Sequence, residues 1–314
     1  MSSLRELRER INTVASTAKI TGAIKMIASA KFHRYEQRLS QAAPYHEAVK
    51  QILTHLYASE SEGSLQSEFM SERKVRYIAI VALGSDGGLC GAYNINICKS
   101  LKAATDQLQH DGITIDLYPI GKKFRHVIQS AKLQGVNIIA DSDIKAETDT
   151  GHINRLLATL QERFVNHEVD KVELMYMHHL SATRQTFLRQ SLFPVEFNND
   201  GNDGIDSNNS NNGNNGINGN KGNEGNDCIN PFCILEPDAN KILNNVLPMY
   251  AASMMHNAFM ENLTCTYATR IIAMETANDN ATKLNDELTL ELNKLRQEEI
   301  TTQLLDIQGG QTGD

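Results

Sequence analysis

The two ends of this 314-residue chain lack the residues that interrupt helices. Proline and glycine are absent from residues 249–308, and within residues 1–43 the only such residue is Gly22. A helix over the first of these stretches would rise about 90 Å at 1.5 Å per residue, about three times the ~30 Å span of a small domain. Because no compact domain can bury a helix of that length, we expect it to project from one.

The chain also lacks the features of membrane-spanning and nucleic-acid-binding proteins. No apolar run approaches the roughly 20 residues that cross a bilayer, and the helical pattern starts at Leu4, which leaves no room for a signal or transit segment before it. The formal net charge is −8, whereas binding to nucleic-acid phosphates needs a dense basic surface. We therefore expect a cytosolic protein with no nucleic-acid partner and no segment inserted in a membrane.

The chain also lacks recognisable disulfide, metal-binding and catalytic sites. The odd number of scattered cysteines argues against a secreted disulfide framework; they are Cys90, Cys98, Cys228, Cys233 and Cys265. Cys228 and Cys233 lie close enough for a redox switch, but two thiols in a loop are more often inert. The neighbours His178 and His179 point to opposite faces of a predicted strand. No cluster has zinc spacing and no catalytic set stands out, so we predict no catalytic residue, metal ligand or cofactor.

The N-terminal end carries the repeat of a coiled coil. Apolar residues recur at alternating spacings of three and four, the a and d positions of a heptad: Leu4, Leu7, Ile11, Val14 and Ala18. The C-terminal stretch has a looser seam of the same kind, formed by Leu284, Leu288, Leu292 and Leu295. A single helix is marginal in water unless its apolar stripe packs against a partner, so we expect the two ends to pair with each other.

The charges of the two ends favour this pairing. Residues 1–50 carry nine Lys/Arg and four Asp/Glu, a net charge of +5, whereas residues 249–314 carry four and ten, a net charge of −6. The alternative is that both are ordinary solvated faces with an accidental imbalance, since exposed ion pairs are weak and are screened by salt.

The middle of the chain alternates short apolar runs with helical patterns. Strands are predicted at residues 75–83, 113–120, 136–139 and 171–178, an extended segment at 183–195, and helices at 93–109, 122–134 and 152–167. This alternation is typical of a parallel sheet covered by helices on both faces, so the fold class is α/β.

Residues 198–230 differ in kind from the rest of the chain. They hold 14 Asn and 7 Gly in 33 positions and almost nothing apolar to bury. Such a segment cannot offset the entropy lost on ordering, so we expect a disordered surface loop. Its function is not readable from its sequence.

One glycine-rich cluster, residues 84–91, follows the first predicted strand and precedes a helix. That is where α/β folds bind phosphates, but the P-loop lysine is missing and the spacing is not that of a dinucleotide fingerprint. Two interpretations stay open: a nucleotide site, and a tight turn in which the glycines permit positive φ.

Three segments resemble one family. The opening helix with KITGAIKM at residues 19–26, the motif SDGGLCGAYN at 85–94, and residues 274–310 through nearly their whole length are similar to the gamma subunits of F-type rotary ATP synthases. These matches span the chain from Leu4 to Gly310 except for residues 198–230. Two positions depart from the family: Gly22 stands where a lysine is usual, and Gly87 where an arginine is common.

The resemblance implies a Rossmann-like parallel-sheet domain between N- and C-terminal helices that pair as a long antiparallel coiled coil. On this basis we divide the chain into an N-terminal coil helix, residues 1–58; the α/β domain, 72–197; the Asn/Gly-rich insert, 198–230; and a C-terminal coil helix, 236–310.

The resemblance also implies a function. Such a chain is the central rotor stalk, which couples proton flow to ATP synthesis or hydrolysis by turning inside a ring of alpha and catalytic beta subunits. Its other partners are the epsilon subunit and the membrane c-ring. It carries no catalytic site of its own, and it lies on the cytoplasmic face of the bacterial inner membrane as a peripheral protein.

Contact residues follow from the resemblance position by position. Small or flexible side chains on the first helix suit a bearing surface: Ile24, Met26, Ala28 and Ser29. Polar residues on the last helix are candidates for orientation-dependent contacts with the ring: Arg270, Arg296, Gln297 and Thr301. Two rival interpretations remain. A nucleotide-binding enzyme would bind its ligand at residues 84–91, and a generic scaffold would form a symmetric, oligomerising rod.

Overall fold

The computed structural model describes residues 4–59, 67–71, 73–139, 145–147, 150–181, 184–195 and 238–310. The predicted insert at residues 198–230 lies outside the described residues, as do both Cys228 and Cys233. The chain divides into two compact units. We call Met1–Phe32, Leu89–Gly91 and Tyr267–Asp314 the coil unit, and His33–Gly88 and Ala92–Thr266 the sheet unit.

Two long helices contribute to both units: α1 (Leu4–Ser59) and α5 (Ala239–Gly310). Each contains one proline, Pro44 or Pro248, and continues past it, at the cost of one backbone hydrogen bond. At 72 residues, α5 rises about 108 Å. Within the described ranges, no helix has both the length and the apolar character that crossing a membrane requires.

The heptad repeat seen at the start of α1 continues along the whole helix. Beyond Ala18 the alternating spacing of three and four runs through Thr21, Lys25, Ala28, Phe32, Tyr35, Leu39, Ala42, His46, Val49, Leu53 and Leu56. Every one of these residues is buried or partly buried, which is expected when one stripe of a helix faces a partner throughout.

The sheet unit is built on five strands: β1 (Tyr77–Leu83), β2 (Thr114–Ile120), β3 (Val136–Ile138), β4 (Lys171–His179) and β5 (Gln185–Phe193). Their order is β3-β2-β1-β4-β5, and β5 adds an antiparallel edge to an otherwise parallel sheet. Six of the seven residues of β1 are buried, as expected for a central strand that is covered on both faces.

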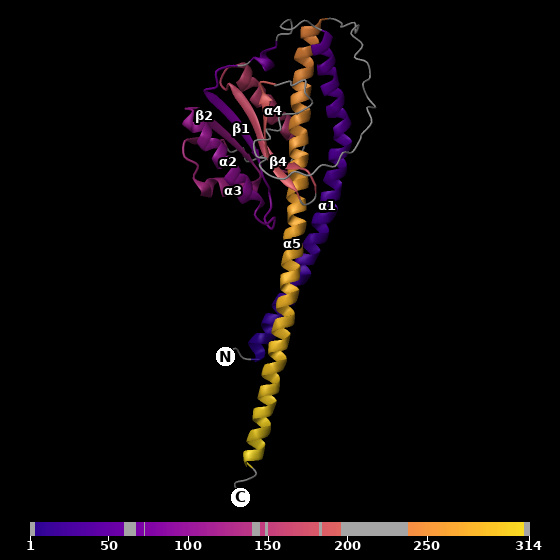
Figure 1. Ribbon diagram of the computed structural model, residues 1–314, viewed down its shortest axis with the longest axis vertical. Helices are drawn as coiled ribbons and strands as arrows, with labels where there is room; N and C mark the ends of the chain where they lie inside the picture. The colour runs from indigo at the N-terminus through magenta and orange to yellow at the C-terminus, as the bar shows by residue number, and fades with distance from the viewer. Residues whose placement is uncertain are drawn as a thin grey trace, which may run out of the picture. The chain divides into compact units, whose positions relative to one another are not determined.

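Helices cover both faces of this sheet (Figure 1). One face packs against α4 (Thr150–Val165) and the parts of α1 and α5 that belong to the sheet unit, in a core that contains Leu53, Phe164, Leu174 and Phe259. The other face is covered by α2 (Tyr93–His110) and α3 (Lys122–Ala131). Helix α3 ends three residues before its predicted end because Lys132 adopts a left-handed conformation, with φ of 46°.

Candidate functional site

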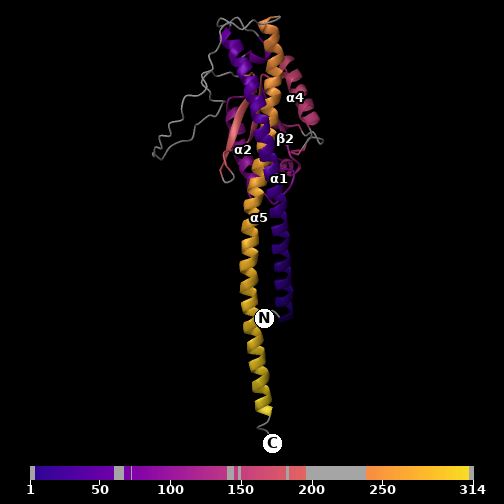
Figure 2. The same ribbon diagram turned by 90° about the vertical axis from the view of Figure 1, so that its right-hand side faces the viewer.

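In the coil unit, α1 and α5 lie side by side in an antiparallel pair (Figures 1 and 2). Three polar contacts fix their register: Thr21 Oγ1 lies 3.4 Å from Asn278 Oδ1, Lys25 Nζ 2.7 Å from Glu275 Oε1, and Lys31 Nζ 2.9 Å from the Tyr267 hydroxyl. Extended along both helices to Leu4, the first described residue of α1, the same register places Leu4 opposite Leu295. The antiparallel pairing implied by the resemblance is therefore present.

The seam between the two helices mixes large apolar residues with small and polar ones. Buried positions on α5 include Ala281 and Leu288, separated by Asn285, whose Oδ1 is buried without a hydrogen-bond partner among the described residues. Leu284, predicted for this seam, is partly buried, as is Asn285 beside it. A Cβ added at Gly22 would meet only Asn278 Oδ1, at 3.9 Å, so the seam also has room there.

The ring of Tyr267, the first residue of α5 in the coil unit, contacts two cationic side chains. Its ring centroid lies 5.1 Å from Lys31 Nζ and 4.8 Å from the guanidinium carbon of Arg270. Both cations are attracted by the negative face of the ring, so Arg270, a predicted contact residue, is held by a neighbour one turn away. Tyr267 and Lys31 were missed by sequence reasoning, because the heptad repeat of α1 runs through Ala28 and Phe32 and does not include Lys31.

The predicted bearing surface on α1 is only partly exposed. Met26 is 70% exposed and Ile24 is partly buried, while Ala28 is 1% exposed. The prediction is therefore wrong for Ala28, which occupies a seam position and faces α5. Two other residues of α1, Ile20 and Ile27, are exposed, and sequence reasoning did not single them out. Because they are seven residues apart, they lie on the same face of the helix.

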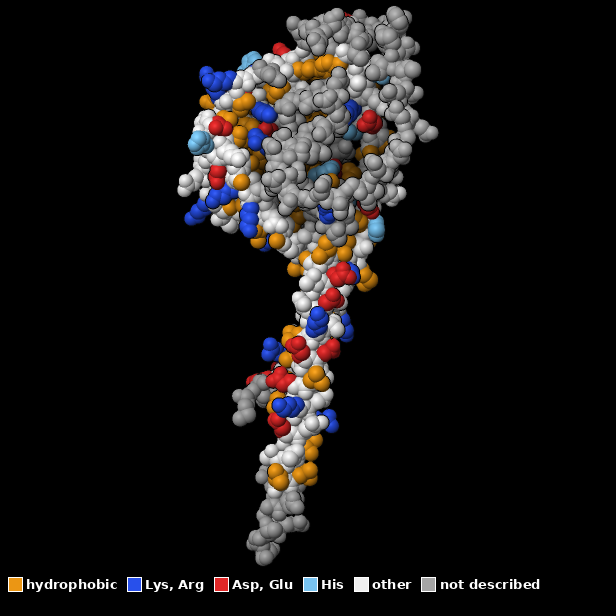
Figure 3. All heavy atoms as spheres, in the orientation of Figure 1, with side chains coloured by type: hydrophobic (Ala, Val, Ile, Leu, Met, Phe, Trp, Pro, Cys, Tyr) orange, Lys and Arg blue, Asp and Glu red, His pale blue; other side chains and the backbone are white. Residues whose placement is uncertain are grey.

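The last part of α5 has no partner helix among the described residues. Residues 296–305 are all exposed, because the described part of α1 begins at Leu4, opposite Leu295, and does not extend beside them. The predicted contact residues Arg296, Gln297 and Thr301 lie on this free segment. It also exposes apolar side chains at Ile300, Leu304 and Leu305, which sequence reasoning missed although they extend the apolar content of the helix beyond the leucine seam. Figure 3 shows the surface of the coil with positive, negative and hydrophobic side chains interspersed.

The glycine-rich turn after β1 is closed by its own chain. A Cβ at Gly84 would lie 2.2 Å from the ring of Phe124, so the space beside this glycine is filled. Asp86 accepts hydrogen bonds from the backbone amides of Lys122, at the start of α3, and Glu147. The Ser85 amide donates to the side chain of Asn94. A phosphate would need these amides, so the geometry favours the tight-turn interpretation over the nucleotide site.

The end of the same glycine-rich motif belongs to the coil unit. Gly91 adopts φ of +56°, and a Cβ there would lie 3.7 Å from the Cβ of Ala273 on α5. Glycine is favoured here, because it adopts this left-handed conformation without the strain that a larger residue carries.

Comparison with known proteins gives a consistent result. A family model described as ATP synthase matches residues 3–313. The chain is 33% identical to the ATP synthase gamma chain of Parabacteroides distasonis over 99% of this chain and 98% of that one, and 33% identical to that of Phocaeicola vulgatus over 99% of both.

Solved structures show the same fold. A chain in the mitochondrial ATP synthase of Euglena gracilis, from a structure of OSCP, F1 and the c-ring, aligns with a TM-score of 0.60 and 19% identity over 98% of this chain and 93% of its own length. A chain in the central stalk and c-ring structure from Tetrahymena thermophila aligns with a TM-score of 0.54 and 20% identity over 82% and 99%. At these identities the likeness concerns fold alone. With the family model and the bacterial gamma chains matched over nearly the whole sequence, this chain belongs to the ATP synthase family.

Proposed function

We propose that this chain is the central rotor stalk of an F-type ATP synthase, which couples transmembrane proton flow to ATP synthesis or hydrolysis. It rotates inside the ring of alpha and beta subunits and imposes different conformations on the catalytic subunits. The observation that carries this proposal is the coil unit, an antiparallel pair of helices from which one helix continues alone past Leu295.

An asymmetric shaft of this kind can act on identical subunits around it. A ligand with equal affinity for two conformations shifts neither, so the shaft must present a different surface to each catalytic subunit. Two unlike helices satisfy this requirement. Helix α1 exposes three apolar side chains here, Ile20, Met26 and Ile27, whereas α5 exposes one isoleucine, Ile272, beside the acidic Glu275 and Asp279.

The free segment of α5 supports insertion into a surrounding protein. Ile300, Leu304 and Leu305 are between 45% and 62% exposed, and apolar side chains grouped on one helix end gain free energy when a partner covers them. Arg296, Gln297 and Thr301 on the same segment then make the orientation-dependent polar contacts, with Arg270, Ile24 and Met26 nearer the other end of the coil.

The remaining parts of the proposal concern location and chemistry. The partners are the alpha and beta subunits, the epsilon subunit and the membrane c-ring. ATP is made or hydrolysed on the surrounding subunits, so this chain is a non-catalytic subunit of the synthase. The complex places it on the cytoplasmic face of the bacterial inner membrane as a peripheral protein. The similarity of this chain to bacterial ATP synthase gamma chains, and its fold likeness to a chain of a solved mitochondrial ATP synthase, support these assignments.

The test compares the full chain with a chain that ends at Leu295, which removes the free segment and keeps every described helix pair. Each is tagged, and the complex is purified from native membranes. We expect alpha and beta subunits to co-purify with the full chain, and coupled ATP synthesis in reconstituted vesicles to fall sharply for the shortened one. Arg296→Ala and Thr301→Ala in the full chain should reduce synthesis less than truncation does.

Two results would overturn the proposal. One is a full chain that purifies without alpha and beta subunits. The other is a shortened chain that supports coupled synthesis at the rate of the full chain, since the free segment would then have no role in coupling.

A further inference from the structure

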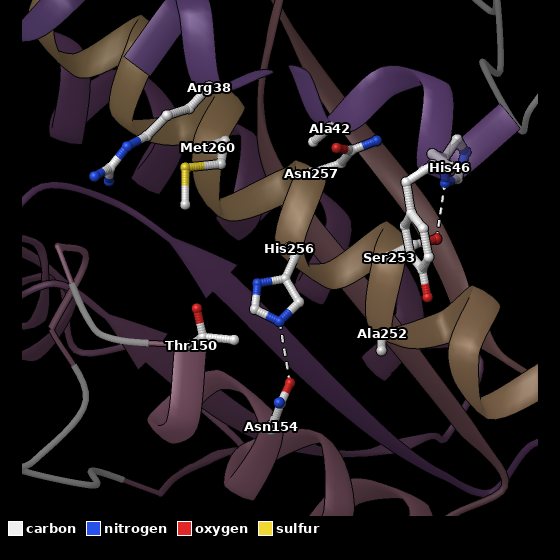
Figure 4. A pocket seen from close by; sticks show the side chains of 11 residues that line it. Arg38, Ala42, His46, Thr150, Asn154, Ala252, Ser253, His256, Asn257 and Met260 are labelled. Atoms are coloured by element: carbon white, nitrogen blue, oxygen red, sulfur yellow. Dashed lines mark hydrogen bonds between the residues drawn. The ribbon is translucent and has the colours of Figure 1, made fainter. Parts of the chain in front are cut away.

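A pocket of about 480 Å³ opens in the sheet unit between three helices. Helix α1 contributes Arg38 and His46, α4 contributes Thr150 and Asn154, and α5 contributes residues from Ala252 to Met260. In Figure 4, Arg38 and Met260 lie across the open space from Thr150, with His256 between them. The volume falls within the roughly 300–1,000 Å³ of small-molecule sites.

The histidine at the centre of the pocket is held in one orientation. His256 Nε2 lies 3.0 Å from Asn154 Oδ1 and donates its proton to it (Figure 4). Burial lowers the pKa of His256, which favours the neutral ring at pH 7. In this tautomer, Nδ1 carries a lone pair and accepts a hydrogen bond.

Charge in the pocket is of one sign. Arg38 is its cation, and its guanidinium carbon lies 5.8 Å from the ring centroid of Tyr35. Among the described residues that line the pocket there is no aspartate or glutamate, and none in the described chain pairs with Arg38. A guanidinium with no carboxylate beside it is a ready partner for an anionic group.

The rest of the lining is suited to an apolar body. Met260, Ala42 and Ala252 present apolar surface, and the thioether of methionine adapts to irregular or aromatic shapes. Tyr45 adds an aromatic side chain from α1. A ligand here would contact α1, α4 and α5 at once.

We propose that this pocket binds a small amphiphilic organic anion, with its anionic group on Arg38 and its aromatic or aliphatic body against Met260, Ala42 and Ala252. A hydrogen-bond donor on the ligand pairs with Nδ1 of His256. The site is separate from the coil unit and does not depend on the proposed rotor function. A bound ligand contacts three helices and stabilises the folded sheet unit by an amount that rises with the logarithm of ligand concentration above Kd.

The test uses two fluorescent probes with nearly the same aromatic body. One, 8-anilinonaphthalene-1-sulfonate, carries an anionic sulfonate; the other, N-phenyl-1-naphthylamine, does not. Each is titrated against the full chain. We expect the sulfonate probe to saturate one site and to raise the melting temperature. Arg38→Gln should weaken the sulfonate probe by about tenfold and leave the neutral probe within about twofold.

Three further variants locate the binding and control for charge. Ala252→Trp fills the pocket from α5 and should abolish saturable binding of both probes; because the chain has no other tryptophan, its emission also reports whether the variant has folded. If it does not fold, Ala42→Phe fills the same space from α1. Arg155→Gln makes the same charge change at an exposed α4 position outside the pocket and should bind both probes as the wild type does.

The result that overturns the proposal is probe binding that survives the filling variants, which would place it on exposed apolar surface elsewhere. Equal weakening by Arg38→Gln and Arg155→Gln would also overturn it, because the effect would then be one of general charge. Absence of saturable binding by the sulfonate probe would do the same.

Discussion

The same two helices build two regions that differ in how many small and polar residues they bury. In the sheet unit, the repeat on α1 supplies Val49, Leu53 and Leu56 to a core that also buries Leu243 and Leu247 of α5. In the coil unit, the same repeat supplies Thr21, Lys25 and Ala28 as well as Leu7, and α5 contributes Ala281 and Asn285 as well as Leu288. Periodicity therefore decides that the helices pair, and side-chain size and polarity decide how strongly.

This difference suits the proposed roles of the two regions. A core of large apolar residues gives one well-packed arrangement, because each lost methylene leaves a void. A seam that interrupts its apolar residues with small and polar ones buries less apolar surface, so it tolerates adjustment and has a lower stability per turn. We therefore expect the coil unit to open locally more often than the sheet unit, on the timescale that hydrogen exchange measures.

The largest expected effect breaks the core of the sheet unit. Phe164 is fully buried, with its ring centroid 5.5 Å from that of Phe193 and 4.7 Å from the guanidinium carbon of Arg73. Phe164→Ala should lower the free energy of unfolding by about 3–5 kcal/mol, measured by urea denaturation. Leu288→Ala in the coil unit is the matched comparison, and we expect a loss of about 2 kcal/mol that hydrogen exchange confines to coil amides. Equal, global losses would contradict the contrast between the units.

The next effect concerns a charged group inside the sheet unit. Glu173 is 2% exposed and accepts two hydrogen bonds from Arg189, at 2.6 and 2.9 Å, while Lys171 Nζ lies 3.3 Å away. Arg189→Met should cost about 3 kcal/mol, because the carboxylate stays buried with one partner fewer.

The control for this pair removes both charges. Glu173→Leu combined with Arg189→Met should recover most of the stability lost by the single variant, since no buried charge is left unpaired. If the double variant is as unstable as Arg189→Met alone, packing by the arginine stem, and not the charge, is the cause.

A smaller effect is expected when a polar residue of the coil seam is replaced by an apolar one, as in the core of the sheet unit. Asn285 keeps a buried amide oxygen without a hydrogen-bond partner among the described residues, so Asn285→Leu should stabilise the coil by about 1 kcal/mol. That corresponds to about fivefold slower exchange of coil amides. Asn280→Leu makes the same substitution at an exposed position of α5 and should leave exchange unchanged. Equal slowing in both variants would show that helix propensity, not the seam, was responsible.

How far the sequence predicts this molecule depends on the range of the interactions. The long helices, the strands and the pairing of the two ends follow from local periodicity and from the absence of breakers. The burial of Asn285 beside Leu284 does not, because Asn285 is polar and only the partner helix covers it.

Contacts across the fold are likewise hidden in the sequence. Nothing in the printed sequence links His178 with Glu261, 83 positions away, or brings Arg38 and Thr150 to one pocket. The free apolar residues Ile300 and Leu304 were readable as apolar, but their exposure follows from where α1 begins opposite α5. Site residues were predicted mainly through family resemblance, and their roles remain proposals.

The smallest expected effect is a pH dependence of stability that concerns the sheet unit alone. His178 Nδ1 donates to Glu261 Oε2 at 2.6 Å, which ties β4 to α5 within the sheet unit; His46 and Tyr176 line the same small cavity. The hydrogen bond to Glu261 raises the pKa of His178, against the opposing effect of burial. The folded-state pKa thus exceeds the ordinary value of about 6.5, so this stabilisation is fully present below pH 6.5 and is lost as pH rises through the folded pKa.

The measurement is the free energy of unfolding between pH 5.5 and 8.5 for the wild type and for His178→Gln. Nearby His256, whose pKa is lowered by burial, acts in the opposite sense and costs stability as pH falls below about 6.5, so both proteins should carry His256→Gln. The difference between them should shrink as pH rises, and exchange of coil amides should not follow it, because the ion pair belongs to the sheet unit. A difference that stays constant across this range would mean that His178 contributes as a neutral ring, with the bond to Glu261 independent of charge.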